Sequence, residues 1–322
     1  MEPARQTQSD AHVVKDDDSY YAVDDSYEAL KAFITNYRKE NGRTYHRLSD
    51  GKYHGPNDEL EQDRLDFAHS LWLLTWDGEL CNCPKRDGAN NVLELGTGTG
   101  IWAMEYADSY PEATVLGVDL SPIQPGVVPP NCYFEADDVE QEWEYEEPFD
   151  FIFMRAMVGS FRDWPSILAK AYDNLEPGGY VEIQDNEFPV RCDDNTMPED
   201  SVVLKWTEYM VEATENIGQP IDVAPSFKRL VEEAGFVDVE ERIAYWPVGT
   251  WPKDPYLKEI GRWCQSSMMQ GIDSICLALF TRVLGWKKEE VLVFCAHVRN
   301  EVRKGNVHGY FPVYCVWGRK PK

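Results

Sequence analysis

Three glycines at alternate positions are the residues of this chain best suited to hold a ligand. Gly96, Gly98 and Gly100 follow directly after the apolar run Val92–Leu95. Glycine lets the backbone approach a ligand closely, and a helix that begins after such a turn offers free N–H groups to a polar ligand. We expect that helix to begin at Ile101. The pattern therefore predicts a site for a nucleotide-like cofactor.

A carboxylate at the end of the next apolar run would provide a second anchor for such a cofactor. Asp119 ends the run Thr114–Asp119, and it lies roughly 20 residues beyond the glycine turn, where α/β nucleotide folds hold ribose hydroxyls. A carboxylate accepts hydrogen bonds from two hydroxyls at once, and such bonds are about twice as strong as neutral ones. We therefore predict that Asp119 binds a ribose.

Apolar runs separated by helical stretches must position these residues. Such alternation predicts an α/β fold with a doubly wound parallel sheet, whose ligands lie beyond the carboxyl ends of the strands. The glycine turn and Asp119 both map to that edge. The predicted strands are Val92–Leu95, Thr114–Asp119, Cys132–Val139 (which runs into an acidic loop), Phe149–Met154 and Tyr180–Gln184.

The last third of the chain adds a helix, two strands and a long insertion. A helix is predicted over 224–235, followed by a strand over 236–240 and a last strand over 313–318. The insertion between those strands, Trp246 to His308, is rich in aromatic residues and methionine. A segment of this kind usually builds the lid and the substrate pocket of such a fold, because ligand sites are mostly apolar.

Glycines at alternate positions, preceded by Glu94, resemble motif I of the class I S-adenosylmethionine (SAM) methyltransferases. The N-terminal part carries a closer resemblance, to fungal methyltransferases grouped with the secondary-metabolism regulator LaeA. The matching blocks are Arg43–His46, Pro56–Glu59, Asp63–Asp66 and Leu74–Gly78, and the likeness covers residues 26 to 322. The resemblance implies SAM as cofactor and a Rossmann-like, seven-stranded, mostly parallel sheet with an antiparallel last strand.

Composition, apolar spacing and the resemblance together divide the chain into parts. Residues 1–25 form an acidic leader that we predict to be disordered, and 26–90 form a helical cap that begins with a helix from about 26 to 41. Residues 91–245 form the SAM-binding core. A helical lid, 246–309, and the last core strand, 310–322, complete the chain.

Residues that would bind SAM follow from the family motifs. Asp137 or Asp138 would accept from the adenine amino group, and Tyr45 and Tyr53 of the cap would reach the cofactor. Arg64 would pair with a carboxylate, either that of the cofactor or that of Glu94. The full predicted set is Tyr45, Tyr53, Glu94, Gly96, Thr97, Gly98, Gly100, Asp119, Leu120, Asp137, Asp138, Val139, Met154 and Arg155.

The implied chemistry is in-line transfer of a methyl group, in which the protein mainly aligns the reacting atoms. A hydroxyl or ammonium nucleophile would also need a base, and no residue stands out as one. Candidates by type are His46, His69, Asp185, Glu187 and His297, with Gln184 beside them. Arg155 could instead orient an acidic substrate. The predicted substrate residues are Met157, Trp246, Trp251, Trp263, Met268 and Met269.

Composition excludes several classes of protein. A formal net charge of −26 would repel a nucleic-acid backbone, and no apolar stretch is long enough to span a membrane. Eight scattered cysteines fit reduced thiols inside a cell, in the cytoplasm or the nucleus. Cys81 and Cys83 form the only close pair and lack further ligands at zinc-site spacing, so no metal is predicted.

Three functions fit these observations. The first is a methyltransferase that acts on a small molecule, a fungal natural product, at oxygen or nitrogen. A second is a LaeA-like regulator that works through protein partners in the nucleus. The third is an enzyme that binds SAM and catalyses a different reaction, such as a rearrangement.

Overall fold

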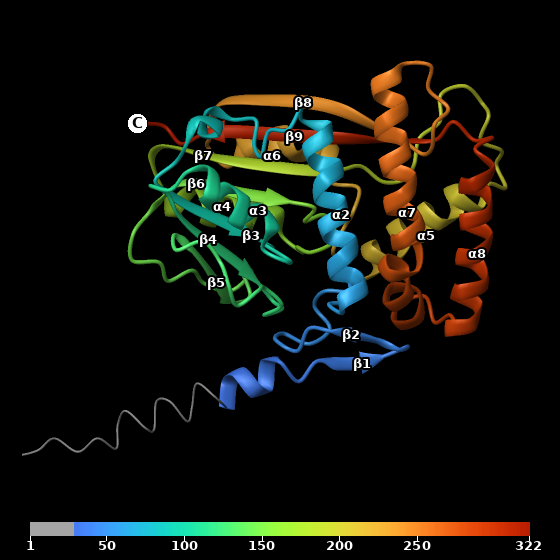
Figure 1. The fold of residues 1–322 in the computed structure, drawn as a ribbon, viewed down its shortest axis with the longest axis horizontal. Coiled ribbons are helices and arrows are strands. Elements are labelled where there is room, and N and C mark those ends of the chain that lie inside the picture. The colour runs from blue at the N-terminus through green and yellow to red at the C-terminus, as the bar shows by residue number, and fades with distance from the viewer. Residues whose placement is uncertain (1–28) are drawn as a thin grey trace, which may run out of the picture.

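A seven-stranded sheet forms the centre of the molecule, seen in a computed structural model that describes residues 29–322 (Figure 1). The strand order is β5-β4-β3-β6-β7-β9-β8. The strands are β3 (Asn91–Leu95), β4 (Thr114–Asp119), β5 (Cys132–Ala136), β6 (Phe149–Arg155), β7 (Leu175–Asn186), β8 (Val237–Pro247) and β9 (Tyr310–Arg319).

The sheet has the predicted class of topology. Strands β3 to β7 pair in parallel, while β9 runs antiparallel to both of its neighbours, β7 and β8. This confirms the doubly wound sheet with an antiparallel last strand. Strand β7 begins at Leu175, before the predicted start at Tyr180, so Pro177, Gly178 and Gly179 belong to the strand.

Helices cover the sheet and form a second body beside it. Figure 1 shows α2 standing between the carboxyl edge of the sheet and the group α5, α7 and α8. No helix in the described part of the chain is long and apolar enough to cross a membrane. The helices are α2 (Glu59–Thr75), α3 (Ile101–Ser109), α4 (Trp164–Asn174), α5 (Val202–Asn216), α6 (Phe227–Glu233), α7 (Pro255–Arg282) and α8 (Lys288–Lys304), with the short turns η1 (Pro84–Asp87) and η2 (Ala224–Ser226).

The N-terminal cap differs from the prediction. Only 29–34 are helical in the described part of the segment predicted as a helix over 26–41. Strands β1 (Arg38–Glu40) and β2 (Arg43–Tyr45) then form a hairpin, and its turn residues Asn41 and Gly42 have φ of 53° and 86°. An Asn-Gly pair is the strongest short hairpin signal, because both central residues of that turn need positive φ. The predicted disordered leader, 1–25, lies outside the described residues.

Two apolar layers hold the sheet. Trp102 of α3 stacks on Phe153 of β6 with ring centroids 4.0 Å apart, and both side chains are fully buried. On the other face, Trp164 of α4 packs against Phe227 of α6. Because both faces are covered, the central strands are mostly apolar, and buried acids on them such as Glu94 and Glu182 have hydrogen-bond partners. The carboxyl ends of the parallel strands remain to carry a site.

Candidate functional site

The glycine turn leaves β3 and leads into α3 at the carboxyl edge of the sheet. Gly96, Gly98 and Gly100 have φ of 70°, 57° and 82°, a region in which side chains are strained. The turn is also crowded: a Cβ added at Gly96 would overlap Sδ of Met157, and one at Gly100 would overlap the ring of Phe134. Glycine at these positions therefore allows the backbone of the turn to lie close to a ligand.

Asp119 faces the turn from the end of β4. Its carboxylate accepts the backbone N–H of Gly98 at 2.9 Å and that of Ser121 at 2.8 Å. Burial raises the pKa of Asp119 to about 6, and the two N–H donors act in the opposite direction. Each oxygen keeps acceptor capacity for a further donor, so the carboxylate can bind the two hydroxyls of a ribose.

Glu94 lies under the turn on the last part of β3. It accepts the hydroxyl of Thr97, and burial raises its pKa to about 7, against the effect of that hydrogen bond and of the charge of Arg155. A buried acid of this kind is stabilised as a carboxylate when a cation arrives. It can therefore respond to an ammonium group on a ligand.

A cavity of about 140 Å³ opens beside Asp119. Most of the predicted cofactor residues line it, namely Tyr53, Gly96, Gly98, Asp119, Leu120, Asp137, Asp138, Val139 and Arg155. Within this set, Asp138 already binds Lys52 and accepts the hydroxyl of Ser49 at 2.9 Å. Asp137 is the exposed acid of the pair, so it is the better candidate for the adenine amino group.

Three predicted cofactor residues line neither cavity: Gly100 at the end of the glycine turn, and two residues with large side chains. Tyr45 is buried under the guanidinium of Arg282, which lies 4.6 Å from its ring centroid. The side chain of Met154 is fully buried in the core between the sheet and α4. Their side chains hold the cap and the sheet and do not line a ligand site.

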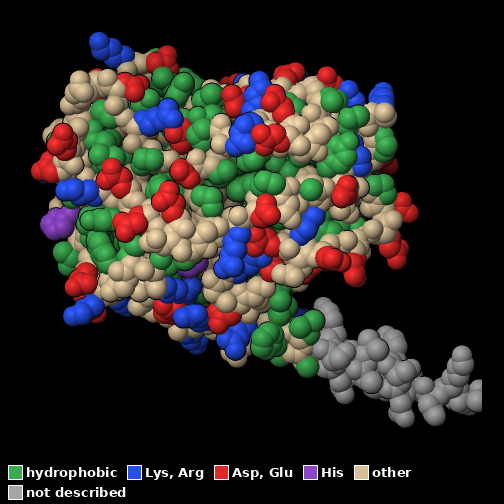
Figure 2. Space-filling model, turned by 180° about the vertical axis from the view of Figure 1, so that it is seen from behind, with side chains coloured by type: hydrophobic (Ala, Val, Ile, Leu, Met, Phe, Trp, Pro, Cys, Tyr) green, Lys and Arg blue, Asp and Glu red, His purple; other side chains and the backbone are tan. Residues whose placement is uncertain are grey.

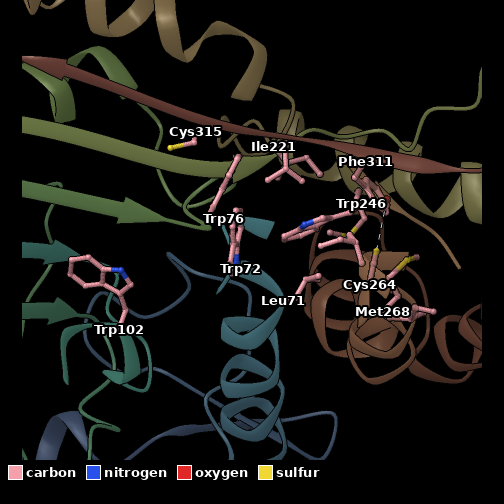
Figure 3. Close-up of a cluster of buried hydrophobic side chains, with 14 of the residues drawn as sticks. Leu71, Trp72, Trp76, Trp102, Ile221, Trp246, Cys264, Met268, Phe311 and Cys315 are labelled. Carbon is pink, nitrogen blue, oxygen red and sulfur yellow. Dashed lines mark hydrogen bonds between the residues drawn. The ribbon is translucent and has the colours of Figure 1, made fainter. Parts of the chain in front are cut away.

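A second cavity, of about 190 Å³, runs from the glycine turn toward the helical group. It shares Leu65, Gly96, Gly98, Arg155 and Ala156 with the first one, so the two adjoin at the turn. Its far part, here called the aromatic end, is lined by Leu71, Trp72, Asn186, Phe188, Trp206, Trp246, Cys264, Ser267, Met268, Ile275 and Phe311. Figure 3 shows Trp246, Phe311, Cys264, Met268 and Leu71 gathered from different elements.

The aromatic end was only partly predicted. Trp246 and Met268 line it, and Met157 lines the smaller cavity instead. Trp251, Trp263 and Met269 line neither: Trp251 stacks on His308, and Trp263 stacks on Phe67. Trp246 belongs to β8 instead of the helical insertion. The prediction missed Trp72, Trp206, Phe188 and Phe311, because no local pattern links residues of α2, α5, β9 and the loop after β7.

Arg155, at the end of β6, lies where the cavities meet. Its guanidinium donates to Nδ1 of His69 at 2.8 Å, and Nε2 of His69 lies 2.9 Å from the carboxylate of Glu105. Burial and the charge of Arg155 lower the pKa of His69. Both ring nitrogens are therefore engaged, and His69 orients Arg155 instead of standing free as a base.

Arg64 of α2 also lines the larger cavity. Its Nε donates to the carboxylate of Glu61 at 2.9 Å, one turn away on the same helix. The internal partner predicted from the sequence was Glu94, and the observed partner is Glu61. Residues three apart on a helix lie on the same side of it, so the Arg64 side chain meets Glu61 of its own helix more readily than Glu94 of β3.

The other candidate bases line neither of the two cavities. His46 binds the carbonyls of Leu48 and Tyr53, while His297 is exposed on α8, away from both cavities. Asp185 accepts the N–H of Val158 at 2.7 Å, and burial raises its pKa to about 7.

Glu187 and Gln184 complete that set. Glu187 accepts the hydroxyl of Tyr314 at 3.0 Å and pairs with Arg191. Gln184 donates to Glu182 at 2.7 Å and is fully buried. Neither lines a cavity, so these side chains position loops at the edge of the site.

Cys81, Cys83 and Glu182 form a buried cluster whose ligand atoms lie within 4.8 Å of one another. The carboxylate accepts the N–H groups of Asn82 and Cys83, the latter at 2.7 Å, and the amide of Gln184. Burial raises the pKa of the Cys83 thiol well above its usual value. Glu182 thus fixes the loop between α2 and β3.

Comparison with known proteins agrees with this geometry. A family model described as "Methyltransferase domain" matches residues 35–241. The chain is 40% identical over 300 residues to "Methyltransferase pytC" of Aspergillus terreus, which covers 93% of each chain. It is 37% identical over 290 residues to "Secondary metabolism regulator LAE1" of Cochliobolus heterostrophus, covering 88% of this chain and 94% of that one.

A solved structure shows the same fold at low sequence identity. It is that of a Haemonchus contortus phosphoethanolamine N-methyltransferase in complex with phosphomonomethylethanolamine and S-adenosylhomocysteine. The TM-score is 0.50 at 16% identity, over 92% of this chain and 73% of the other.

Proposed function

We propose that this chain, which belongs to the methyltransferase-domain family, methylates a small organic molecule bound in the aromatic end. The family and the relatives show a SAM-dependent methyltransferase of fungal secondary metabolism. One observation carries the proposal: the cavity at Asp119 adjoins an aromatic cavity through Gly96, Gly98 and Arg155. A donor in one and an acceptor in the other would meet at the turn. In this proposal, residues 29–90, the described part of the segment predicted over 26–90, form the cap, and residues 246–309 form the lid.

The residues around the turn fit SAM. Asp119 would bind the ribose hydroxyls and Asp137 the adenine amino group, while Tyr53 lies along the same cavity. Glu94 would face the ammonium of the methionine moiety, since it is a buried acid without a cation in contact among residues 29–322. When bound, SAM supplies an electrophilic methyl group on a sulfonium.

The aromatic end would orient the acceptor and exclude water. Trp72 and Trp246 meet edge to face with centroids 4.6 Å apart, and the indole N–H of Trp246 donates to Thr75 at 2.7 Å. Such fixed rings give a planar molecule a defined slot. Aligning the nucleophile with the methyl carbon and sulfur can supply several kcal/mol of barrier lowering, of the order of 7 or more in well-oriented cases.

A regulatory role through protein partners is the second candidate. It is favoured by the likeness to a relative named as a secondary-metabolism regulator. Under this reading the acceptor would be a protein side chain, and the site of action would be the nucleus. The surface does not oppose either candidate, because acidic and basic side chains are interspersed on the face seen in Figure 2.

Methyl labelling separates these candidates. The purified protein would be incubated with SAM that carries a trideuteromethyl group, together with a fungal metabolite extract, and all fractions would be analysed by mass spectrometry. We expect the label in a small molecule, and we expect the Asp119→Asn variant to lose it. Label only in protein would favour the regulatory candidate, and an unlabelled isomer would overturn methyl transfer.

A further inference from the structure

Arg155 places a buried positive charge where the two cavities meet. It donates a hydrogen bond to His69, and none of the salt bridges formed by residues 29–322 includes it. Burial lowers the pKa of Arg155 to about 10, against the charges of Glu94 and Glu105. A buried cation without a carboxylate partner is costly, so an anion that enters the cavity would be favoured.

The guanidinium borders the aromatic end. Its central carbon lies 5.8 Å from the ring centroid of Trp72, which forms a wall of that end, and His69 fixes its orientation. Arg64, the other arginine of the larger cavity, is already neutralised by Glu61. The positive charge left for a ligand therefore borders the aromatic end, where the acceptor would lie, as well as the cavity beside Asp119.

The aromatic end offers no base among the residues that line it. Its only ionisable side chain is Cys264, and burial raises the pKa of that thiol to about 12. Asn186 and Ser267 are neutral at all ordinary pH values. An acceptor that needs its proton removed during transfer would find no group at the aromatic end to take it. Elsewhere in the larger cavity, His69 is engaged at both ring nitrogens and Glu94 accepts the hydroxyl of Thr97.

We propose, on the basis of the proposed function, that the acceptor carries an acidic oxygen that is ionised before it binds, such as an enolate or a carboxylate, and that Arg155 holds this oxygen. A lone pair of the oxygen forms the new bond to the methyl carbon. The carbon–sulfur bond breaks, and its electron pair stays on sulfur, which becomes a neutral thioether. No proton moves, and an anion and a cation become two neutral products.

The test measures binding with matched probes at neutral pH. The quenching of tryptophan fluorescence reports occupancy, because Trp72, Trp206 and Trp246 line the cavity. The probes are 4-hydroxycoumarin, an ionised enol, 2-naphthoate, a carboxylate, and 4-methoxycoumarin, a neutral molecule of similar shape. Three proteins are compared, namely the wild type, the Arg155→Gln variant and the Arg155→Lys variant, each with S-adenosylhomocysteine bound. The two anions distinguish an enolate acceptor from a carboxylate acceptor.

We expect the wild type to bind at least one anion roughly tenfold or more tightly than the neutral probe, in line with a charge-assisted bond. Arg155→Gln should remove this preference, Arg155→Lys should keep part of it, and affinity for S-adenosylhomocysteine should stay within about threefold. No anion preference in the wild type would overturn the inference. A loss confined to S-adenosylhomocysteine affinity would also overturn it and assign Arg155 to the carboxylate of the cofactor.

The pH profile gives an independent readout. Transfer to a pre-ionised acceptor should have a kcat that is flat across neutral and mildly alkaline pH, whereas a required base would give a sloping limb. If the labelled product of the fungal extract proved to be a methylated amine, only this inference would fail, and the proposed function would stand.

Discussion

The two cavities of this protein are built in opposite ways. Around Asp119 the polar part of the wall is backbone and carboxylate, with a glycine turn of positive φ and the acids Asp119 and Asp138, and apolar side chains such as Leu120 and Phe161 line the rest. At the aromatic end they are side chains of α2, α5, α7, β8 and β9, with a single ionisable thiol among the residues that line it. The backbone around Asp119 suits a cofactor that stays the same. The side chains of the aromatic end can be changed one at a time without disturbing the sheet.

This contrast separates the fixed part of the chemistry from the variable part. Backbone at the end of a strand is set by the sheet, so a change at the turn affects the cofactor and little else. Side chains at the aromatic end come from distant elements, so a change there affects the fit of the acceptor. Mutations in the two cavities should therefore act on different kinetic constants.

Gly96→Ala should have the largest effect. The added Cβ would overlap the end of the Met157 side chain at a residue with φ of 70°, so either the turn or Met157, which lines the cavity beside Asp119, must shift. We expect affinity for SAM to fall by about 100-fold or more, from several kcal/mol of steric and backbone strain. Titration calorimetry would measure it. Gly218→Ala is the matched control, because Gly218 has the same φ of 70° with nothing near its added Cβ; equal losses in both variants would contradict the account.

The pH dependence of cofactor binding should depend on Asp119. Its pKa of about 6 in the free protein means that it is largely protonated at pH 5, whereas ribose hydroxyls need the carboxylate as acceptor. Affinity for S-adenosylhomocysteine should fall about tenfold from pH 7 to pH 5, with protons released on binding. Asp119→Asn should bind about 10- to 100-fold more weakly at pH 7, from a loss of 1.5–3 kcal/mol.

The same raised pKa has a consequence for folding. Because the pKa of Asp119 is higher in the folded state than in the unfolded chain, the protonated acid contributes stability at pH values below its unfolded-state pKa. That contribution is lost as pH rises through about 6. The free energy of unfolding of the ligand-free protein should therefore fall between pH 4 and pH 7, and that of the Asp119→Asn variant should not.

For the binding prediction, a wild-type affinity for S-adenosylhomocysteine that stays constant down to pH 5 would contradict the assignment of Asp119 to the ribose.

Trp246→Phe should have the smallest effect, confined to the acceptor. The change removes the hydrogen bond to Thr75 and part of the cavity wall, so KM for the acceptor should rise about 3- to 10-fold, which corresponds to about 0.7–1.4 kcal/mol. Affinity for SAM should stay within about twofold. Trp263→Phe is the control, because Trp263 stacks on Phe67 outside both cavities. An equal change in both variants would place the acceptor elsewhere.

Local patterns predicted the fold and most of the first cavity. The glycine turn and Asp119 are close in sequence to the strands that position them, so spacing alone placed them at one edge. The hairpin at Asn41 and Gly42 was not predicted, because the helix was extended to residue 41 on the spacing of its apolar residues. The Asn-Gly pair there favours a turn with positive φ.

The second cavity was harder to predict, for a physical reason. Phe188 and Phe311 meet with ring centroids 5.4 Å apart, although more than a hundred residues separate them in the chain. Tertiary contacts alone bring them to Trp72 and Trp206. Trp251 and Trp263 have the same residue type in the expected segment, yet they pack elsewhere. Residue type therefore indicates an apolar surface, and only the fold decides which surface encloses a ligand.

A crystal structure of the complex with S-adenosylhomocysteine tests the central claim most directly. The account predicts ribose hydroxyls within hydrogen-bond distance of the Asp119 carboxylate, adenine beside Asp137, and the sulfur atom at the glycine turn, facing Trp72 and Trp246. An adenosine bound in the aromatic end, or a ligand that leaves Asp119 untouched, would contradict it.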